Sequence, residues 1–299
     1  MARRQCALVL EGGGFRGAFT AGVLDVLLEQ GIHTDSFASV WGVSAGALNA
    51  VSYRSRQIGR TIRIMLAYRD DPRLMSVRSW ATTGNLAGAE FMYDEVQHVL
   101  DPCDFETFDR DGTPMFFVAS DVVFGTPAYL PVSGGKEDVR KAQASASMPA
   151  VSHMVEIEGH RYLDGGTCDS IPFAAAMKLP GARPVPDAPV ATRALVVLTQ
   201  DASYVKMGAP ERAVIRTHRY DAYPYYIEAL RTRAERYNAQ RSELAGLEKE
   251  GKCLVILPPR PVDVSAAEHD GERILSLYLE GRQAAASRIG EIRSFIGMS

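Results

Sequence analysis

The stretch from Cys6 to Gly17 reads CALVLEGGGFRG and predicts a buried strand that ends in a turn of small residues. Apolar residues at helical spacing follow in Gly17 to Glu29 (GAFTAGVLDVLLE), so the sequence predicts a strand, a glycine turn and a helix in succession. The spacing Gly12-x-Gly14-x-x-Gly17 matches the turn of a dinucleotide-binding fold. Small residues at a helix N-terminus let backbone amides approach a pyrophosphate or an oxyanion equally well, so the turn alone leaves both uses open.

A second strand, turn and helix are predicted directly after the first helix. Ser36 to Trp41 (SFASVW) predicts a short strand, and the segment from Ala45 onward (AGALNAVSYRS) predicts a helix. Between them GVSAG fits G-x-S-x-G, in which Ser44 occupies a sharp strand-to-helix turn and the small residues Gly42 and Gly46 relieve crowding. The helix dipole favours the negative charge that builds up when the serine hydroxyl attacks. A glycine- and serine-rich turn without chemistry stays open as an alternative, because this motif also occurs by chance.

The acid of a dinucleotide-binding fold does not stand in its expected place. Such a fold carries it at the end of the second strand, about 20 residues after the glycines, where it holds the ribose. Here the second strand ends in GVSAG, and the nearest acid, Asp35, precedes that strand. The sequence therefore favours an oxyanion-binding role for the backbone amides of Gly12, Gly13 and Gly14. For Arg16, a contact with substrate and a surface salt bridge are equally open.

Attack by a serine also needs a base. Asp164 follows the predicted strand GHRYL and precedes two glycines, which indicates a tight turn that presents the carboxylate, although an ordinary turn is the alternative. Asp121 follows the predicted strand Met115 to Ser120 (MFFVAS) and ranks second as a candidate base. His153 and His160 flank this region and could in principle complete a triad, but local hydrogen bonds in a hairpin are the favoured interpretation.

Together these motifs resemble the patatin-like phospholipase family, and in particular its bacterial members. The family is similar in having a D-G-G or D-G-A turn whose aspartate is the base (here Asp164), a G-x-S-x-G nucleophile (Ser44) and a glycine-rich oxyanion loop G-G-G-x-R-G (Gly12, Gly13, Gly14, Arg16 and Gly17). A further family block, A-S-x-A-x-P, stands here as ASASMP at residues 144–149, with serine in place of its second alanine. The resemblance covers roughly residues 5 to 180 with four ordered motifs, although Glu11 stands where plant members carry aspartate.

The resemblance implies a reaction, a substrate class and a fold. It implies hydrolysis of lipid or phospholipid acyl esters by a Ser-Asp dyad without metal or organic cofactor, in the manner of a lipase, phospholipase A or lysophospholipase. It also implies a three-layer α/β/α fold with a mostly parallel central sheet. A catalytically silent lipid-binding or regulatory module of the same fold is the alternative, and a nucleotide-binding protein is a weaker one. The head group, the acyl length and the oligomeric state stay open.

The size and the strand pattern predict a single α/β domain over residues 1–299. The chain has 299 residues, of which 46% are hydrophobic, enough for a substantial core. The motif-bearing core is expected at about 5–180, and a C-terminal strand and helices at 194–299. Ala194 to Thr199 (ALVVLT) and Cys253 to Leu257 (CLVIL) are apolar runs typical of strands covered on both faces, and helical patterns between the strands predict a mostly parallel sheet.

Charge and cysteine usage exclude several classes. A net charge of -3 gives no basic footprint for nucleic acid, and four scattered cysteines without a Cys/His cluster predict no metal site. Because no apolar run approaches the roughly 18 residues that span a bilayer, we expect a cytoplasmic protein. The arginine-rich region Arg54 to Arg78 and the aromatic region Tyr220 to Tyr226 leave open a peripheral contact with the inner face of the membrane, against a favoured solvated basic face. Residues 69–89, predicted irregular, and 100–108 are expected to contribute to the acyl pocket.

Overall fold

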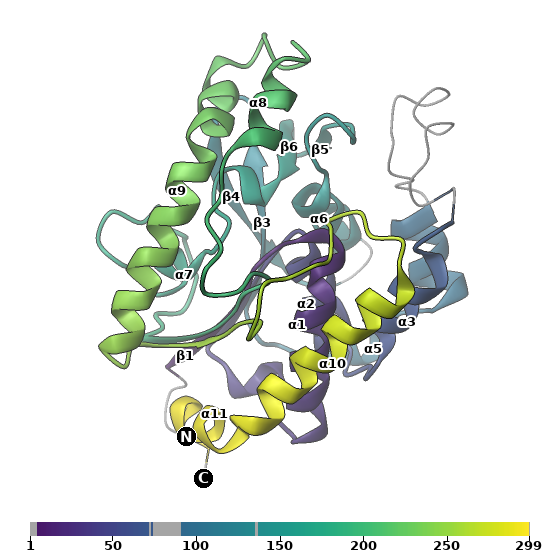
Figure 1. Ribbon diagram of the computed structural model, residues 1–299, viewed down its shortest axis with the longest axis vertical. Helices are drawn as coiled ribbons and strands as arrows, with labels where there is room; N and C mark the ends of the chain where they lie inside the picture. Colours follow the sequence, from purple (N-terminus) through teal and green to yellow (C-terminus); the bar gives the residue numbers. More distant parts are fainter. Residues whose placement is uncertain (1–4, 72, 74–90, 135–136, 299) are drawn as a thin grey trace.

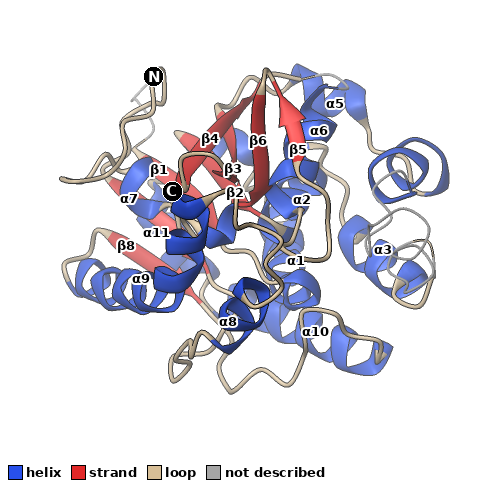
Figure 2. Ribbon diagram, turned by 90° about the horizontal axis from the view of Figure 1, so that it is seen from above, coloured by secondary structure: helices blue, strands red, loops and turns tan. Residues whose placement is uncertain are grey.

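An eight-stranded sheet lies between two layers of helices, as Figures 1 and 2 show. The computed structural model describes residues 5–71, 73, 91–134 and 137–298. The strands are β1 (Cys6–Leu10), β2 (Ser39–Val43), β3 (Met115–Asp121), β4 (Thr126–Val132), β5 (Val155–Ile157), β6 (His160–Asp164), β7 (Arg193–Val197) and β8 (Cys253–Ile256). The predicted three-layer fold is confirmed.

The sheet is parallel at its centre and antiparallel at one side. Its strand order is β5-β6-β3-β2-β1-β7-β8, and β4 pairs with β3. The strands β8, β7, β1, β2 and β3 all run in parallel, whereas β4, β5 and β6 form antiparallel pairs. Because the carboxyl ends of neighbouring parallel strands meet at one edge, the turns that follow β1 and β2 lie side by side.

Strand β3 brings two distant segments together along one of its edges. All of β3 pairs with β4, so β2 and β6 share the opposite edge. Val43, the last residue of β2, pairs with Val118. Asp164, the last residue of β6, pairs with the next residue, Ala119. The ends of β2 and β6 therefore meet.

Alternate side chains of the central strands pack against different helical layers. Leu8 and Leu10 of β1 pack with helices α1 (Gly17–Glu29), α2 (Ala45–Arg54), α10 (Gly271–Ser287) and α11 (Ile289–Ile296). Ala7 and Val9 face the other way, toward α7 (Phe173–Ala176) and α9 (Pro224–Lys249). This period of two explains why the strands read as continuous apolar runs. Figure 1 shows α9 in green and α10 in yellow on different sides of the sheet.

Smaller elements surround these layers. They are α3 (Arg60–Tyr68), the π-helical segment η3 (Phe91–Leu100), α5 (Phe105–Arg110), α6 (Glu137–Ala146), α8 (Ala209–Ile215) and, within the described residues, three 3₁₀ turns: η1 (Gly14–Arg16), η2 (Thr34–Ser36) and η4 (Gly165–Thr167).

 The turn η4 follows β6 directly, η1 begins at Gly14 shortly after β1 ends at Leu10, and η2 lies shortly before β2.

Two predicted element boundaries are wrong, each for a local reason. The second strand begins at Ser39 rather than Ser36, because residues 34–36 form the 3₁₀ turn η2. The sequence pattern of Gln57 to Tyr68 predicts a third helix from Gln57, but this helix begins at Arg60, because Gly59 adopts a left-handed φ of 74° and interrupts it there. The irregular stretch predicted at 69–89 falls mostly outside the described residues. The predicted single domain stays a prediction, which the shared sheet of β1 to β8 supports.

Candidate active site

Ser44 lies in a strained turn between β2 and α2. Its backbone has φ 54° and ψ -121°, a conformation that non-glycine residues rarely adopt and that recurs at functional sites. A Cβ at Gly42 would lie 2.6 Å from the Cα atom of Ala47, and one at Gly46 would collide with the carbonyl oxygen of Leu10. The two small residues therefore let the turn pack closely, as the motif predicted. The Ser44 side chain is buried but lines a cavity.

Asp164 lies beside Ser44 because β3 aligns the ends of β2 and β6. The Ser44 side chain lies close enough to the Asp164 carboxyl group that its hydroxyl lowers the pKa of that group. The Oδ1 atom of Asp164 also accepts a hydrogen bond of 2.8 Å from the backbone amide of Gly166. A Cβ at Gly165 would collide with the carbonyl oxygen of Val118, so the turn after Asp164 can cross β3 only with glycine there. The D-G-G pattern is thus explained by packing as well as by presentation of the carboxylate.

Burial raises the pKa of Asp164 above its ordinary value of 3.8. Smaller opposing effects lower it: the hydrogen bond with Ser44, the charge of Arg233, the amide of Gly166 and the charge of Lys206. A carboxylate with a raised pKa is a stronger base, which suits the removal of a proton from a hydroxyl group. The environment of Asp164 therefore fits it for the role of base.

The glycine-rich loop lies directly against Ser44. A Cβ at Gly12 would lie 2.8 Å from the Cβ of Ser44, so only glycine allows this approach. Among the described residues, the amides of Gly12, Gly13 and Gly14 donate no hydrogen bond, whereas the next amide, of Phe15, donates to Ala266 at 3.2 Å. Such unengaged amides are the donors that a developing oxyanion requires.

Arg16 and Gly17 lie at the end of this loop, where α1 begins. Within the part of the chain that the structure describes, the Nε atom of Arg16 is buried and lacks a hydrogen-bond partner. No ion pair of Arg16 occurs there either, so the surface salt bridge considered from the sequence is not observed. Gly17 packs against α2, where Asn49 donates a hydrogen bond of 3.0 Å to its carbonyl oxygen.

The ASASMP block holds both candidate catalytic residues by hydrogen bonds. The Ser145 hydroxyl accepts a hydrogen bond of 2.9 Å from the amide of Ser44 and donates one of 2.6 Å to the carbonyl of Val118. The carbonyl oxygen of Ser147 accepts a hydrogen bond of 2.7 Å from the amide of Asp164. The Ser147 hydroxyl instead donates to the carbonyl of Gln143 in α6 at 2.7 Å, away from the site. The sequence resemblance located this block but did not reveal its positioning role.

Asp121 and His160 form a separate pair. The Oδ1 atom of Asp121 accepts hydrogen bonds from the amides of Val123 and Phe124, and its Oδ2 atom lies 2.9 Å from Nδ1 of His160. The predicted hairpin between β5 and β6 is confirmed, with His160 on β6 and half of its side chain exposed. Asp121 thus serves the turn after β3, which supports Asp164 as the better candidate base.

Residues of α9 also contact the site, and the sequence analysis missed them. Arg233 donates a hydrogen bond of 2.5 Å to the carbonyl of Gly166 and pairs with the buried Glu211 at 2.9 Å. The Tyr237 hydroxyl donates one of 2.7 Å to Glu11, just before the glycine-rich loop. No motif marks these residues, because long polar side chains on a mostly polar helix read as surface.

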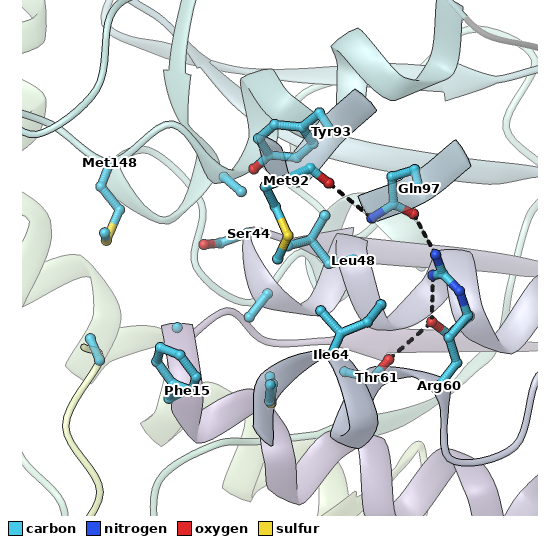
Figure 3. A pocket seen from close by; sticks show the side chains of 16 residues that line it. Phe15, Ser44, Leu48, Arg60, Thr61, Ile64, Met92, Tyr93, Gln97 and Met148 are labelled. Carbon is cyan, nitrogen blue, oxygen red and sulfur yellow. Dashed lines mark hydrogen bonds between the residues drawn. The ribbon is translucent and has the colours of Figure 1, made fainter. Parts of the chain in front are cut away.

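Lys206 and Tyr93 complete the surroundings of Asp164. Burial, and then the charge of Arg233, lower the pKa of Lys206 to about 8. Its Nζ atom lies 5.0 Å from the centre of the Tyr237 ring. Burial and then the charge of Asp164 raise the pKa of Tyr93, a residue of η3 that lines the cavity at Ser44. Figure 3 shows Ser44 and Tyr93 among the side chains that line this cavity.

Asp35 is exposed and lies before β2, at the strand end opposite to Ser44. It is therefore no partner for the glycine-rich loop, in agreement with the argument against a dinucleotide site. Within the described residues, no group of three or more His, Cys, Asp or Glu side chains is placed to hold a metal ion. All four cysteines are free and buried. None of the described helices combines the length and apolar character that a bilayer crossing requires.

Comparison with known proteins defines the class to which this fold and site belong. The family model for patatin-like phospholipases matches residues 8–177, more than half of the chain. The chain therefore belongs to the patatin-like phospholipase family. The matched region contains Ser44, Asp164 and the glycine-rich loop. A second family model, described as a domain of unknown function (DUF6363), matches residues 223–297, which include α9 and α10.

Individual relatives are more distant. The uncharacterized protein YjjU of Escherichia coli (strain K12) is 31% identical over 177 residues, which are 58% of this chain and 48% of YjjU. The chain thus spans about half the length of this relative. Among solved structures, VipD from Legionella pneumophila is similar with a TM-score of 0.48 and 11% identity, over 96% of this chain and 67% of that one.

Proposed function

We propose that this protein is a serine acyl hydrolase that cleaves lipid acyl esters in the manner of a lipase, phospholipase A or lysophospholipase. The observation that carries the proposal is the meeting of three groups at one edge of the sheet. They are the Ser44 hydroxyl, the buried Asp164 carboxyl group that it contacts, and the unengaged amides of Gly12 to Gly14. Membership of the family supports a lipid acyl substrate.

The reaction proceeds in two steps through one covalent intermediate. Asp164 accepts the hydroxyl proton as the Ser44 oxygen attacks the ester carbonyl carbon, and the Gly12 to Gly14 amides stabilise the oxyanion. The tetrahedral intermediate collapses to an acyl-serine, and Asp164 returns the proton to the departing alcohol. Asp164 then takes a proton from water, whose oxygen attacks the acyl carbon. Collapse of the second tetrahedral intermediate releases the fatty acid and restores the serine hydroxyl.

Covalent labelling tests the proposal and separates it from a silent lipid-binding module. An alkyl fluorophosphonate should modify Ser44 of the native protein, and peptide mass spectrometry should locate the adduct. Ser44→Ala should prevent labelling and lower ester hydrolysis by several orders of magnitude while the thermal unfolding curve is retained. Hydrolysis by Ser44→Ala within tenfold of the parent would contradict the assignment. A native protein that binds lipid vesicles but is neither labelled nor active would be the silent module instead.

A further inference from the structure

A cavity of about 170 Å³ runs from Ser44 into the layer of helices beside the sheet. Its walls near the serine are apolar and come from separate elements: Phe15, Leu48, Ile64, Met65, Met92 and Met148. In Figure 3, Leu48 and Ile64 lie between Ser44 and a group of polar side chains. An apolar channel that opens at a nucleophile suits the acyl part of an ester, whereas the polar group at its far end does not.

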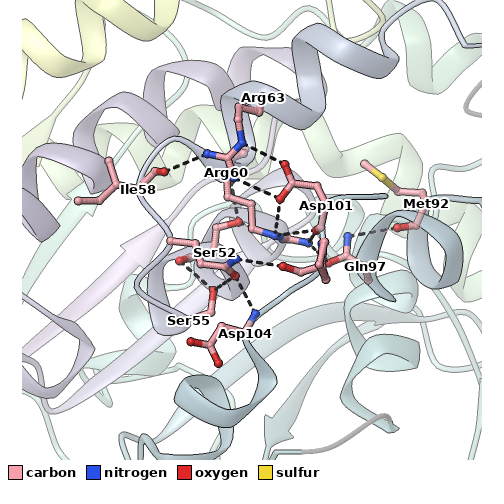
Figure 4. A network of polar contacts seen from close by, with 12 residues as sticks. Ser52, Ser55, Ile58, Arg60, Arg63, Met92, Gln97, Asp101 and Asp104 are labelled. Atoms are coloured by element: carbon pink, nitrogen blue, oxygen red, sulfur yellow. Dashed lines mark hydrogen bonds and ion pairs between the residues drawn. The ribbon is translucent and has the colours of Figure 1, made fainter. Parts of the chain in front are cut away.

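The polar group is a buried floor built around Arg60. The guanidinium group of Arg60, only 2% exposed, donates hydrogen bonds to Ser52 at 3.3 Å and to Gln97 at 2.9 Å. It also donates twice to the backbone carbonyl of Asp101, at 3.1 and 2.6 Å, and its Nε atom lies 3.5 Å from the Asp101 carboxylate. Figure 4 shows these contacts converging on the guanidinium group. Ser52, Arg60 and Gln97 all line the cavity.

The floor is held in place by partners of its own. The Thr61 hydroxyl donates a hydrogen bond of 3.0 Å to Ser52, and the Gln97 amide donates one of 3.2 Å to the carbonyl of Met92. An alkyl chain pressed against this network would have to break hydrogen bonds that it cannot replace. The Asp101 carboxylate, 3.5 Å from Arg60, also pairs with Arg63 at 3.1 Å. The guanidinium donors of Arg60 are nevertheless directed at Ser52, Gln97 and the backbone of Asp101, so the floor does not call for an anionic chain end. It therefore acts as a wall for a neutral alkyl chain.

The distance from the serine to the floor follows from helix geometry. Ser44, Leu48 and Ser52 lie at successive intervals of four on one face of α2 and its N-cap, so the first and last are about 12 Å apart at a rise of about 1.5 Å per residue. A zigzag of carbon-carbon bonds of about 1.5 Å advances about 1.3 Å per bond, so about nine carbons span this distance. The volume agrees in scale, because a cavity of about 150 Å³ admits a six-carbon benzene ring.

We propose that the Arg60-centred floor limits the acyl group to a neutral alkyl chain of about six to ten carbons. The inference rests on the proposed function, because it assigns the substrate class of the same site. It assigns Ser52, Arg60 and Gln97 as the residues that limit chain length. Leu48 lines the side of the channel between these residues and the nucleophile.

The test is a series of 4-nitrophenyl esters with acyl chains of graded length, assayed below the concentration at which they aggregate. The ratio kcat/KM should rise by up to about fourfold per added methylene and stop rising at about ten carbons. Leu48→Phe fills the channel and should move the optimum to shorter chains. Gln97→Ala lowers the floor and should move it to longer ones. Leu275→Phe makes the same change as Leu48→Phe on the exposed face of α10, and should leave the profile unchanged.

Each outcome decides the matter. Three results would overturn the inference and leave the proposed function standing. They are a preference for chains of sixteen carbons, a preference for acyl chains that end in a carboxylate, and a chain-length profile that neither Leu48→Phe nor Gln97→Ala shifts. If one of these variants does not fold, the other variant and the chain-length profile of the native protein test the inference. The rate at which alkyl fluorophosphonates of the same chain lengths label Ser44 measures the chain-length preference without turnover. Absence of both labelling and hydrolysis at every length would overturn the proposed function and the inference with it.

Discussion

Two segments of the chain contribute to the candidate site in different ways. Residues 8–177 supply the groups that would react: the Ser44 hydroxyl, the Asp164 carboxyl group and the amides of the glycine-rich loop. Residues 223–297 supply side chains that position these groups. Arg233 donates a hydrogen bond to the turn after Asp164, and Tyr237 donates one to Glu11. The family motifs therefore carry the groups that would react, while part of their positioning comes from a segment outside the region that the patatin-like model matches.

The largest effect is expected inside the first segment, at Asp164. Asp164→Asn removes the base, so kcat/KM should fall by about 10⁴ or more, as for a lost member of a catalytic unit. The acidic limb of the native pH profile should lie above 3.8, because burial raises the pKa of this carboxyl group and only its ionised form accepts a proton. His160→Ala is the control and should leave most activity, since His160 contacts Asp121. Equal losses in both variants would indicate a triad.

The same variant makes a prediction about stability. Because the pKa of Asp164 is raised in the folded state, the native protein binds the proton more tightly than the unfolded chain does. The resulting contribution to stability is present at low pH and is lost as pH rises from the unfolded value toward the folded one. The side chain of Asp164→Asn stays neutral at both pH values. The thermal stability of this variant, measured relative to that of the native protein, should therefore be higher at pH 7 than at pH 4. A difference that does not vary with pH would contradict the raised pKa.

A smaller effect is expected at Ser145, which lies in the first segment but does not react. Ser145→Ala leaves the amide of Ser44 and the carbonyl of Val118 without their buried partner, which should cost about 2 to 3 kcal/mol of unfolding free energy. The loosened turn should lower kcat/KM by about tenfold. Ser147→Ala is the matched control, because its hydroxyl only donates to Gln143, and it should stay within threefold. Steady-state kinetics and denaturant unfolding of both variants measure the difference.

The second segment is tested at Arg233. Arg233→Met removes a cation that lowers the pKa of Asp164, so the acidic limb of kcat/KM should move to higher pH, with a loss of about fivefold at neutral pH. It also strands the buried Glu211, at a cost of about 3 kcal/mol in stability. Adding Glu211→Gln should restore stability but not the pH limb, and Arg233→Lys should keep the limb near its native position. If the acidic limb of the pH profile of Arg233→Met lies at the native pH, Arg233 does not lower the pKa of Asp164 and the role of α9 is structural.

The smallest effect is expected at Tyr237. Tyr237→Phe removes the hydrogen bond to Glu11, so the free energy of unfolding should fall by about 1 kcal/mol, with kcat/KM within threefold of the native value. Tyr225→Phe makes the same change at an exposed position of the same helix and should have no measurable effect. A loss of activity above tenfold in Tyr237→Phe would show that the second segment does more than hold the loop.

Much of the fold and of the candidate site could be predicted because the relevant signals are local. The glycine turn after β1, the GVSAG turn after β2 and the D-G-G turn after β6 each follow an apolar strand, and steric demands between neighbouring elements fix their small residues. Boundaries failed where a single turn intervened, as at Gly59. The acyl pocket could be predicted only in part, since Phe105 and Phe108 line a second cavity of about 30 Å³ beside the one at Ser44.

The burial of arginines in the region from Arg54 to Arg78 could not be predicted from the sequence. We predicted a solvated basic face, yet Arg54 and Arg60 are buried. Arg54 donates to the backbone carbonyls of Phe108 and Asp111, and Arg60 donates to that of Asp101. A long cationic side chain turns inward only where acceptors from elsewhere in the chain satisfy its donors, and nothing in the local pattern reveals them.

The sequence by itself determined the order of strands, turns and helices and the identity of the groups that would react, because periodicity and turn sterics act between close neighbours. Only the tertiary structure decided that Ser44 and Asp164 meet along β3, that Arg233 and Tyr237 of α9 hold their surroundings, and that Arg60 closes the channel. The physical reason is that a hydrogen bond or a buried charge needs a partner at a few ångströms, and the chain brings such partners together only when it folds.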